Sequence, residues 1–238
     1  MANSYFSFKQ FTVRHDRCAM KVGTDGVLLG AWINVQGAGR IVDVGTGSGL
    51  IAIMMAQRCD AVIDGVEIDA DACSQARENA TACPWNDRIT LHHDSIQHYA
   101  GITDTQYQIV VANPPYFRNS LKPASTMRTQ ARHDTTLNYE SLLHCASKLL
   151  APEGRLAVII PANAITGFTE LAYFQGLFPV RQTLVRARPG KAYSRCLAEF
   201  SGNRDQPADN RELIIRGQDG KEFTDDYRML TKAYYLNF

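Results

Sequence analysis

The stretch "RIVDVGTGSGL" (residues 40–50) decides the fold. It begins with an apolar run typical of a buried strand and continues into a loop with glycine at positions 45, 47 and 49. Leu50, Ile53 and Met54 then follow at helical spacing. Glycine lets the backbone come close to a ligand, and the free N–H groups at a helix start can bind it. The stretch therefore predicts a strand, a ligand-binding loop and a helix in succession.

The same alternation of strand and helix continues outward from this stretch. Further strands are expected at 61–67, 89–93, 107–113 and 155–160, and helices at 69–82, 137–150 and 162–176. This order is typical of a doubly wound α/β fold, a mostly parallel sheet with helices on both faces. Residues 180–202 break the rhythm and predict an antiparallel hairpin at the sheet edge, turning through Pro189-Gly190. Residues 211–217 and a helix near 224–235 complete the chain.

Charge is unevenly distributed along the 238 residues, although the net charge is only +1. Residues 1–115 hold 8 Lys or Arg and 12 Asp or Glu, whereas residues 116–195 hold 11 and 4. The basic segment suggests a polyanionic partner, with a solvated basic face as the alternative. The six cysteines are scattered without a Cys-x-x-Cys pair, which favours a reducing compartment and neither disulfides nor zinc. With neither a signal peptide nor an apolar run near 20 residues, we expect a cytoplasmic protein without metal or membrane contact.

The spacing of the glycine loop distinguishes between cofactors. A dinucleotide fingerprint would place its third glycine at position 50, which is Leu50; the observed spacing is instead Asp43-x-Gly45-x-Gly47-x-Gly49. This form suits a cofactor without a pyrophosphate. Glu67 ends the second strand, where a carboxylate can accept hydrogen bonds from both ribose hydroxyls and would repel a 2′-phosphate. The alternative is that Glu67 only caps the next helix.

These residues together resemble the class I S-adenosylmethionine-dependent methyltransferases over about residues 20–200. The resemblance implies a seven-stranded Rossmann-like sheet and places Ile68 beside Glu67 at the cofactor. It also implies that Asp94 hydrogen-bonds the adenine amine and that "KVGTDGVLLG" (residues 21–30) closes over the methionine end. From that segment we expect cofactor contacts by Lys21, Thr24, Asp25 and Gly26, although Thr24-Asp25-Gly26 also reads as the capping sequence of an ordinary helix. We expect one methyltransferase domain, with a lid (1–35), a core (36–200) and an extension (201–238).

The sequence "NPPY" (residues 113–116) follows the fourth strand, which in that fold ends beside the reactive methyl. The Asn113 side-chain oxygen and the Pro114 carbonyl can accept both N–H bonds of a planar amine and so favour attack by its lone pair. Pro114 and Pro115 stiffen the loop, and Tyr116 offers a face on which a flipped base can stack. The alternative is a turn that only ends the strand. Asn113 is also expected to contact the cofactor.

NPPY-type methyltransferases act on adenine N6, cytosine N4 or a glutamine amide. The nearly full-length resemblance is to bacterial tRNA (adenine-N6) methyltransferases acting on the adenine 3′ of a valine anticodon. It is carried by residues 8–32, "DVGTGSGL", "ANPPYF", "QARHDTTLNYESLL" (130–143) and "LTKAYYLNF". It implies a tRNA partner and a monomer; another RNA amine or a protein glutamine is the alternative. Phosphate contacts are expected from a basic set, although any one member could be idle: Arg14, Arg17, Arg118, Lys122, Arg128, Arg132, Arg186, Arg188, Lys191 and Arg195.

Overall fold

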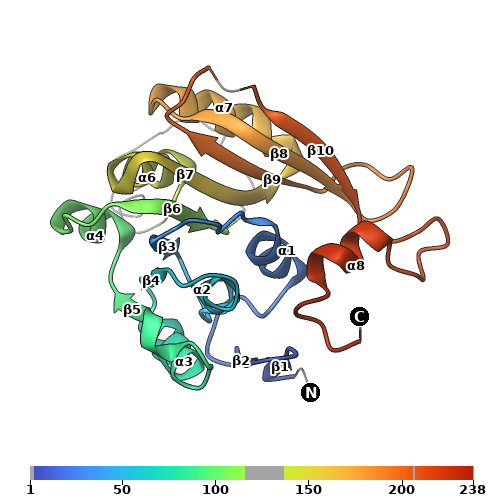
Figure 1. The fold of residues 1–238 in the computed structure, drawn as a ribbon, viewed down its shortest axis with the longest axis horizontal. Helices are drawn as coiled ribbons and strands as arrows, with labels where there is room; N and C mark the ends of the chain where they lie inside the picture. Colours follow the sequence, from blue (N-terminus) through green and yellow to red (C-terminus); the bar gives the residue numbers. More distant parts are fainter. Residues whose placement is uncertain (1–2, 116–136, 206, 238) are drawn as a thin grey trace, which may run out of the picture.

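The computed structural model describes residues 3–115, 137–205 and 207–237. Eight strands form one sheet with helices on both faces, and two short strands form a separate hairpin (Figure 1). The strands are β1 (Tyr5–Ser7), β2 (Thr12–Arg14), β3 (Arg40–Val44), β4 (Val62–Glu67), β5 (Ile89–His93), β6 (Tyr107–Ala112), β7 (Leu150–Pro161), β8 (Phe178–Arg186), β9 (Arg195–Ser201) and β10 (Asp209–Ile214). The helices are α1 (Thr24–Trp32), α2 (Leu50–Ala56), α3 (Ala70–Thr81), α4 (Ile96–Ile102), α6 (Tyr139–Leu149), α7 (Ile165–Phe174) and α8 (Asp225–Thr231).

The large sheet has the strand order β10-β8-β9-β7-β6-β3-β4-β5. The strands from β7 to β5 in this order are parallel, and β9 runs antiparallel between β7 and β8. The predicted mostly parallel α/β sheet with an antiparallel hairpin is confirmed. Two details differ: the sheet has eight strands rather than seven, and the hairpin does not lie at the edge. Both differences arise because β10 pairs in parallel with β8 and becomes the edge strand.

The sheet separates two hydrophobic cores. Neighbouring residues of a strand point to opposite faces, so Ile41 belongs to the core under α1, α2, α3 and α8, whereas Val42 belongs to the core under α4, α6 and α7 (Figure 1). Burial on both faces explains why the central strands are continuous apolar runs rather than alternating ones.

The N-terminal and C-terminal segments lie side by side next to α8. The Lys9 backbone N–H donates to the Tyr234 carbonyl at 2.9 Å, and the ring of Phe6 meets that of Tyr235 edge-on at 6.1 Å. The β1–β2 hairpin, which the sequence pattern does not predict, is held against α3 because the Asn79 side chain bonds both the N–H and the carbonyl of Arg14.

The described ranges contain no helix that is long and apolar enough to cross a membrane. Within them, no group of three or more His, Cys, Asp and Glu side chains could hold a metal ion. All six cysteines carry free thiols.

Candidate active site

Four polar side chains come together where neighbouring strands end. The strands β6, β3, β4 and β5 are adjacent and parallel, so their carboxyl ends share one edge of the sheet. Asp43, Glu67, Asp94 and Asn113 lie on or directly after these ends. Backbone bonds fix their relative placement; the Asp94 N–H, for example, donates to the Glu67 carbonyl at 3.0 Å. In open α/β sheets this edge is where ligands bind.

The glycine loop owes its spacing to backbone conformation. Gly45, Gly47 and Gly49 have φ of +66°, +56° and +80°, in the left-handed region that side chains other than glycine rarely adopt. A Cβ atom on Gly45 or Gly47 would meet no atom of the described residues within 4 Å, so side chains from this part of the protein do not cover the loop backbone there. A ligand can therefore lie directly on this part of the loop.

Glu67 is buried, and backbone N–H groups hold its carboxylate. Oε2 accepts from Gly47 N at 2.8 Å and Oε1 accepts from Asp69 N at 3.0 Å. The cap of α3 is Asp69, which accepts from Ala72 N at 2.8 Å, so the alternative in which Glu67 is only that cap is wrong. Each carboxylate oxygen keeps a second lone pair with which it can accept from a ligand hydroxyl.

The segment before α1 passes close to Glu67. The Cys18 thiol donates to the Gln75 side chain at 3.2 Å. Burial is the main cause that raises the pKa of this thiol to about 11, and the negative charge of Glu67 is the second. The N-terminal segment therefore borders the same site.

Asp43 lies under the glycine loop with one oxygen unused. Its Oδ2 accepts from the Thr46 hydroxyl at 2.6 Å and from Ala52 N at 3.2 Å, while its buried Oδ1 has no hydrogen-bond partner in the described structure. Burial raises the pKa of this carboxyl to about 7. A buried, unpartnered acceptor beside the glycine loop fits the positively charged or N–H-bearing part of a ligand.

Asp94 lies on the rim of a small pocket beyond the glycine loop. The pocket is lined by apolar side chains, including Val44, Ile68 and Ile96, together with Gly45 and Asp94. Oδ1 of Asp94 accepts from Ser95 N at 2.7 Å, and Oδ2 is 2.6 Å from His98 Nδ1. Apolar walls with one fixed carboxylate suit a heteroaromatic ring that carries an amine. His98, a residue that the sequence pattern did not single out, orients this carboxylate; its signal was the i, i+4 spacing from Asp94.

Asn113 follows β6 with its side-chain oxygen turned into the protein. This Oδ1 is buried and has no hydrogen-bond partner in the described ranges. Pro114 is buried and Pro115 is exposed. The predicted stacking residue Tyr116 lies outside the described residues. Within the described residues 113–115 of the motif, the Asn113 amide oxygen is thus an acceptor without a hydrogen bond at the end of the fourth predicted strand.

Helix α1 brings the predicted lid residues next to this edge. Gly26 is buried so close to α2 that a Cβ there would lie 3.0 Å from Leu50 Cδ2. Asp25 forms an ion pair of 2.9 Å with Arg195. The N-cap is Gly23 and makes no side-chain cap bond, so Thr24 starts the helix rather than capping it; Thr24 and Lys21 are exposed.

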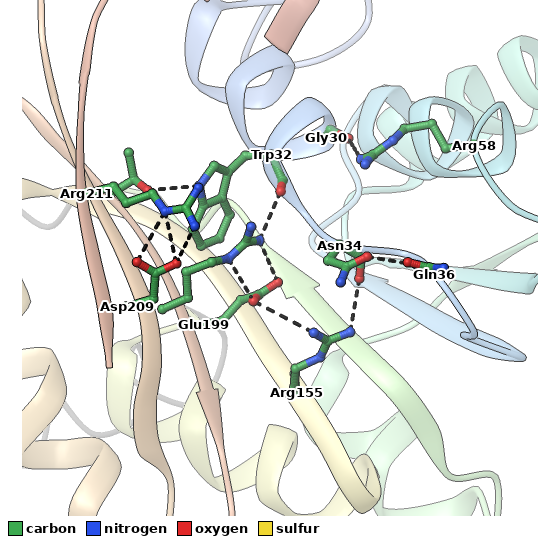
Figure 2. Close-up of polar contacts among 11 residues, drawn as sticks. Gly30, Trp32, Asn34, Gln36, Arg58, Arg155, Glu199, Asp209 and Arg211 are labelled. Atoms are coloured by element: carbon green, nitrogen blue, oxygen red, sulfur yellow. Dashed lines mark hydrogen bonds and ion pairs between the residues drawn. The ribbon is translucent and has the colours of Figure 1, made fainter. Parts of the chain in front are cut away.

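Three arginines hold the other end of α1 (Figure 2). Their guanidinium groups donate to the carbonyls of Gly30, Trp32 and Asn34 at 2.8 to 3.1 Å; the donors are Arg58, Arg181 and Arg155. Cations at a helix C-terminus are stabilised by the helix dipole. Arg181 also bonds both oxygens of the buried Glu199, at 3.0 and 3.1 Å. This anchor lies at the opposite ends of the strands from the candidate site.

The predicted phosphate contacts have different surroundings. Arg118, Lys122, Arg128 and Arg132 lie outside the described residues. Ion pairs engage three of the others: Arg17 with Glu78, Arg186 with Glu212 and Arg195 with Asp25. Arg14, Arg188 and Lys191 are exposed.

Solved structures share this fold. A predicted O-methyltransferase from Agrobacterium tumefaciens superposes with a TM-score of 0.65 at 22% identity, covering 90% of this chain and 100% of the other. The Thermus thermophilus 16S rRNA N2 G1207 methyltransferase, solved with AdoMet and guanosine, gives 0.56 at 17% identity, covering 84% of this chain and 50% of the other.

Sequence comparison identifies much nearer relatives. The family model of the methyltransferase small domain matches residues 18–171. A curated tRNA1(Val) (adenine(37)-N6)-methyltransferase from Phocaeicola vulgatus is 47% identical over 100% of both chains. One from Escherichia coli (strain E24377A) is 43% identical over 97% of this chain and 94% of its own. The chain therefore belongs to the methyltransferase small domain family, and within it to the group of the tRNA1(Val) (adenine(37)-N6)-methyltransferases.

Proposed function

We propose that the protein transfers a methyl group from S-adenosylmethionine to the exocyclic N6 of an adenine in tRNA, at position 37 of a valine tRNA. The names of its full-length relatives supply the reaction and the substrate. The observation that carries the proposal is the buried Oδ1 of Asn113, which has no hydrogen-bond partner among the described residues and lies at the strand edge that also holds Asp43, Glu67 and Asp94.

The residues at this edge fit S-adenosylmethionine part by part. Glu67 would accept the ribose hydroxyls, while Asp94 and the apolar wall with Ile68 would hold the adenine ring. The exposed backbone at Gly45 and Gly47 and the unpartnered Oδ1 of Asp43 would face the methionine end, which carries the ammonium group. The cofactor supplies a methyl group on a positively charged sulfur, which leaves as a neutral thioether without help from an acid.

Asn113 and Pro114 would prepare the nitrogen that accepts the methyl. The N6 lone pair of adenine is delocalised into the ring, so the amine is planar and a poor nucleophile. The Asn113 Oδ1 and the Pro114 carbonyl would accept its two N–H bonds and favour a pyramidal nitrogen with its lone pair directed outward. The nitrogen loses a proton after it gains the methyl group, so this step requires no strong base.

The proposed partner is a tRNA, bound in the cytoplasm through shape and through unstacked bases. Incubation with labelled cofactor and total tRNA from a strain that lacks the gene should yield N6-methyladenosine on nucleoside analysis. Mass spectrometry should map it to position 37 of valine tRNA. A different methylated nucleoside, or a methylated release factor that resists RNase, would contradict the proposal.

Asn113→Ala tests the catalytic role. Loss of one positioned acceptor should lower kcat by about 10²- to 10³-fold. Binding of S-adenosylmethionine, measured by calorimetry, should stay within about threefold because Asp43, Glu67 and Asp94 remain. Asn210→Ala is the matched control, since Asn210 is an exposed amide at the far end of β10. An unchanged kcat in Asn113→Ala would remove the assignment of Asn113.

A further inference from the structure

A second pocket opens on the same side of the sheet as the candidate site. It measures about 560 Å³, within the roughly 300–1,000 Å³ range of ligand pockets. Its walls come from the two ends of the chain, from the segment between β10 and α8 and from the start of α1. They include Phe6, Thr24, Ile215, Arg216, Phe223 and Tyr235. None of these residues except Thr24 belongs to the site described above.

The position of the pocket relates it to the active site in two ways. β7, β8 and β10 all run parallel to β6, so Arg186 and Ile214 end on the same edge as Ala112. Four strand spacings separate β10 from β6, which corresponds to about 19 Å across the sheet. Helix α1 spans part of this distance, since Thr24 lines the pocket and Gly26 packs on Leu50, the residue after the glycine loop.

The chemistry of the pocket is aromatic and cationic. The Arg216 guanidinium lies 4.0 Å from the centroid of the Phe223 ring, and the Phe223 ring stacks on that of Tyr227 at 5.0 Å and 18°. Phe6 and Tyr235 meet edge-on across the junction of the chain ends. Proteins bind unstacked RNA bases on such aromatic rings and on planar arginine groups.

Charges of both signs surround the pocket, and the exposed basic side chains among them can contact the phosphates of an RNA. Arg188 and Lys191 are exposed on the connection between β8 and β9, and Arg188 Nη1 lies 3.2 Å from where a Cβ of Gly220 would be. Two nearby carboxylates are already engaged, Glu212 by Arg186 and Tyr193, and Glu222 by Arg228. Asp225 and Asp226 lie in the first turn of α8, where the helix dipole stabilises their charge.

We propose that this aromatic pocket holds an unstacked base of the substrate tRNA, distinct from the adenine that is methylated. At a rise of about 3.4 Å per stacked nucleotide, 19 Å corresponds to about six nucleotides, so one RNA loop and its stem can reach both places. The inference rests on the proposed function for the identity of the RNA. It assigns a substrate-selecting role to residues outside the family match at 18–171.

The test measures RNA binding separately from methyl transfer. Binding of a fluorescent valine tRNA transcript is measured by anisotropy for the wild type and for two variants, Arg216→Met and Phe6→Leu. Each variant keeps most of the side-chain volume but removes the planar group on which a base could stack. Each should raise the Kd for the transcript about tenfold, in line with the loss of one stacked base, and leave the Kd for S-adenosylmethionine unchanged. Arg211→Met is the matched control, an arginine of β10 with an exposed side chain, and should stay within about twofold of wild type.

Each other outcome is informative. A Kd for the transcript within about twofold of wild type in both variants would overturn the proposal. If a variant no longer shows a thermal unfolding transition, ultraviolet cross-linking of the wild-type complex replaces the binding measurement. The proposal expects cross-links to Phe6 or to residues 215–236, and the absence of any such cross-link would also overturn it. If wild type forms no N6-methyladenosine but Arg216→Met still weakens binding, then the proposed function fails and the pocket stands.

Discussion

Among the described residues, three buried side-chain oxygens have no hydrogen-bond partner: Oδ1 of Asp43, Oδ1 of Asn113 and Oε1 of Gln57, which lies at the end of α2. A buried acceptor without a hydrogen bond costs about 1–3 kcal/mol. Asp43 lies in β3 and Asn113 directly follows the neighbouring strand β6, so both lie at the same edge of the sheet. Two of the three unpartnered oxygens therefore lie where, under the proposed function, a cofactor and an amine would supply the missing bonds.

The pKa of Asp43 makes stability depend on pH. Burial raises it from the ordinary 3.8 to about 7, so the folded chain binds a proton that the unfolded chain has already released. The contribution of the Asp43 carboxyl to the free energy of unfolding should therefore be largest below about pH 4. It should fall as pH rises from about 4 to about 7 and level off above that, by up to about 4 kcal/mol.

Asp43→Asn isolates this contribution, because an amide does not titrate. The free energy of unfolding of the variant and of the wild type is measured in urea at pH 5 and at pH 8. Between these pH values the wild type should lose more stability than the variant. Asp60→Asn changes a fully exposed carboxylate and should show no such trend. A difference that stays constant between the two pH values would contradict the raised pKa.

At the scale of elements, helix α1 is held at one end and leads into the site at the other. Arg181 is central to the anchor: its guanidinium lies 3.7 Å from the Trp32 ring centroid and pairs with Glu199, whose side chain is only 4% exposed (Figure 2). Arg155 contributes a longer contact of 4.0 Å to the same carboxylate. The position of α1 therefore depends on a buried charge cluster as well as on apolar packing.

Arg181→Met should destabilise the protein by about 3–5 kcal/mol, because it leaves the Glu199 carboxylate buried with only the distant Arg155. Equilibrium unfolding in urea measures the change. Arg181→Met combined with Glu199→Leu should recover most of the loss, since the double variant buries no unpaired charge. Arg211→Met, which breaks an exposed pair with Asp209, should cost less than about 1 kcal/mol. A single variant as stable as wild type would show that the cluster does not hold α1.

At the scale of the whole molecule, local pattern predicted most elements but not how they pair. β3 and β4 are buried on both faces, so their apolar runs identify them as parallel strands. The candidate site residues Asp43, Glu67 and Asn113 were recognisable because each lies at or next to the end of such a run. The seven-residue helix α4, with only Ile96 and Tyr99 buried, lacks a clear apolar stripe and was missed.

Long-range pairing lay beyond the sequence because no local pattern encodes it. Nothing in residues 209–214 indicates that β10 will pair with β8 outside the hairpin. The arginines behave likewise: a basic cluster suggests phosphate contacts, yet Arg195 pairs with Asp25, 170 positions away in sequence. Charge counts predict a kind of partner, whereas ion pairs within the fold decide which charges are engaged.

The placement of β9 has a consequence for how the protein can be shortened. The family match ends at residue 171, within α7, and so before β8 and β9. A chain cut there would contain Asp43, Glu67, Asp94 and Asn113 but would leave β7, whose second half is buried, without the antiparallel neighbour that covers it. Long apolar edges recruit strands from other molecules.

Residues 1–176 expressed alone should therefore self-associate, and we predict that the full chain is monomeric; analytical ultracentrifugation of both would test this. A monomeric fragment would contradict this. On this prediction β9 protects the molecule against aggregation, so the smallest unit that stays monomeric would be set by a strand that lies beyond the family match.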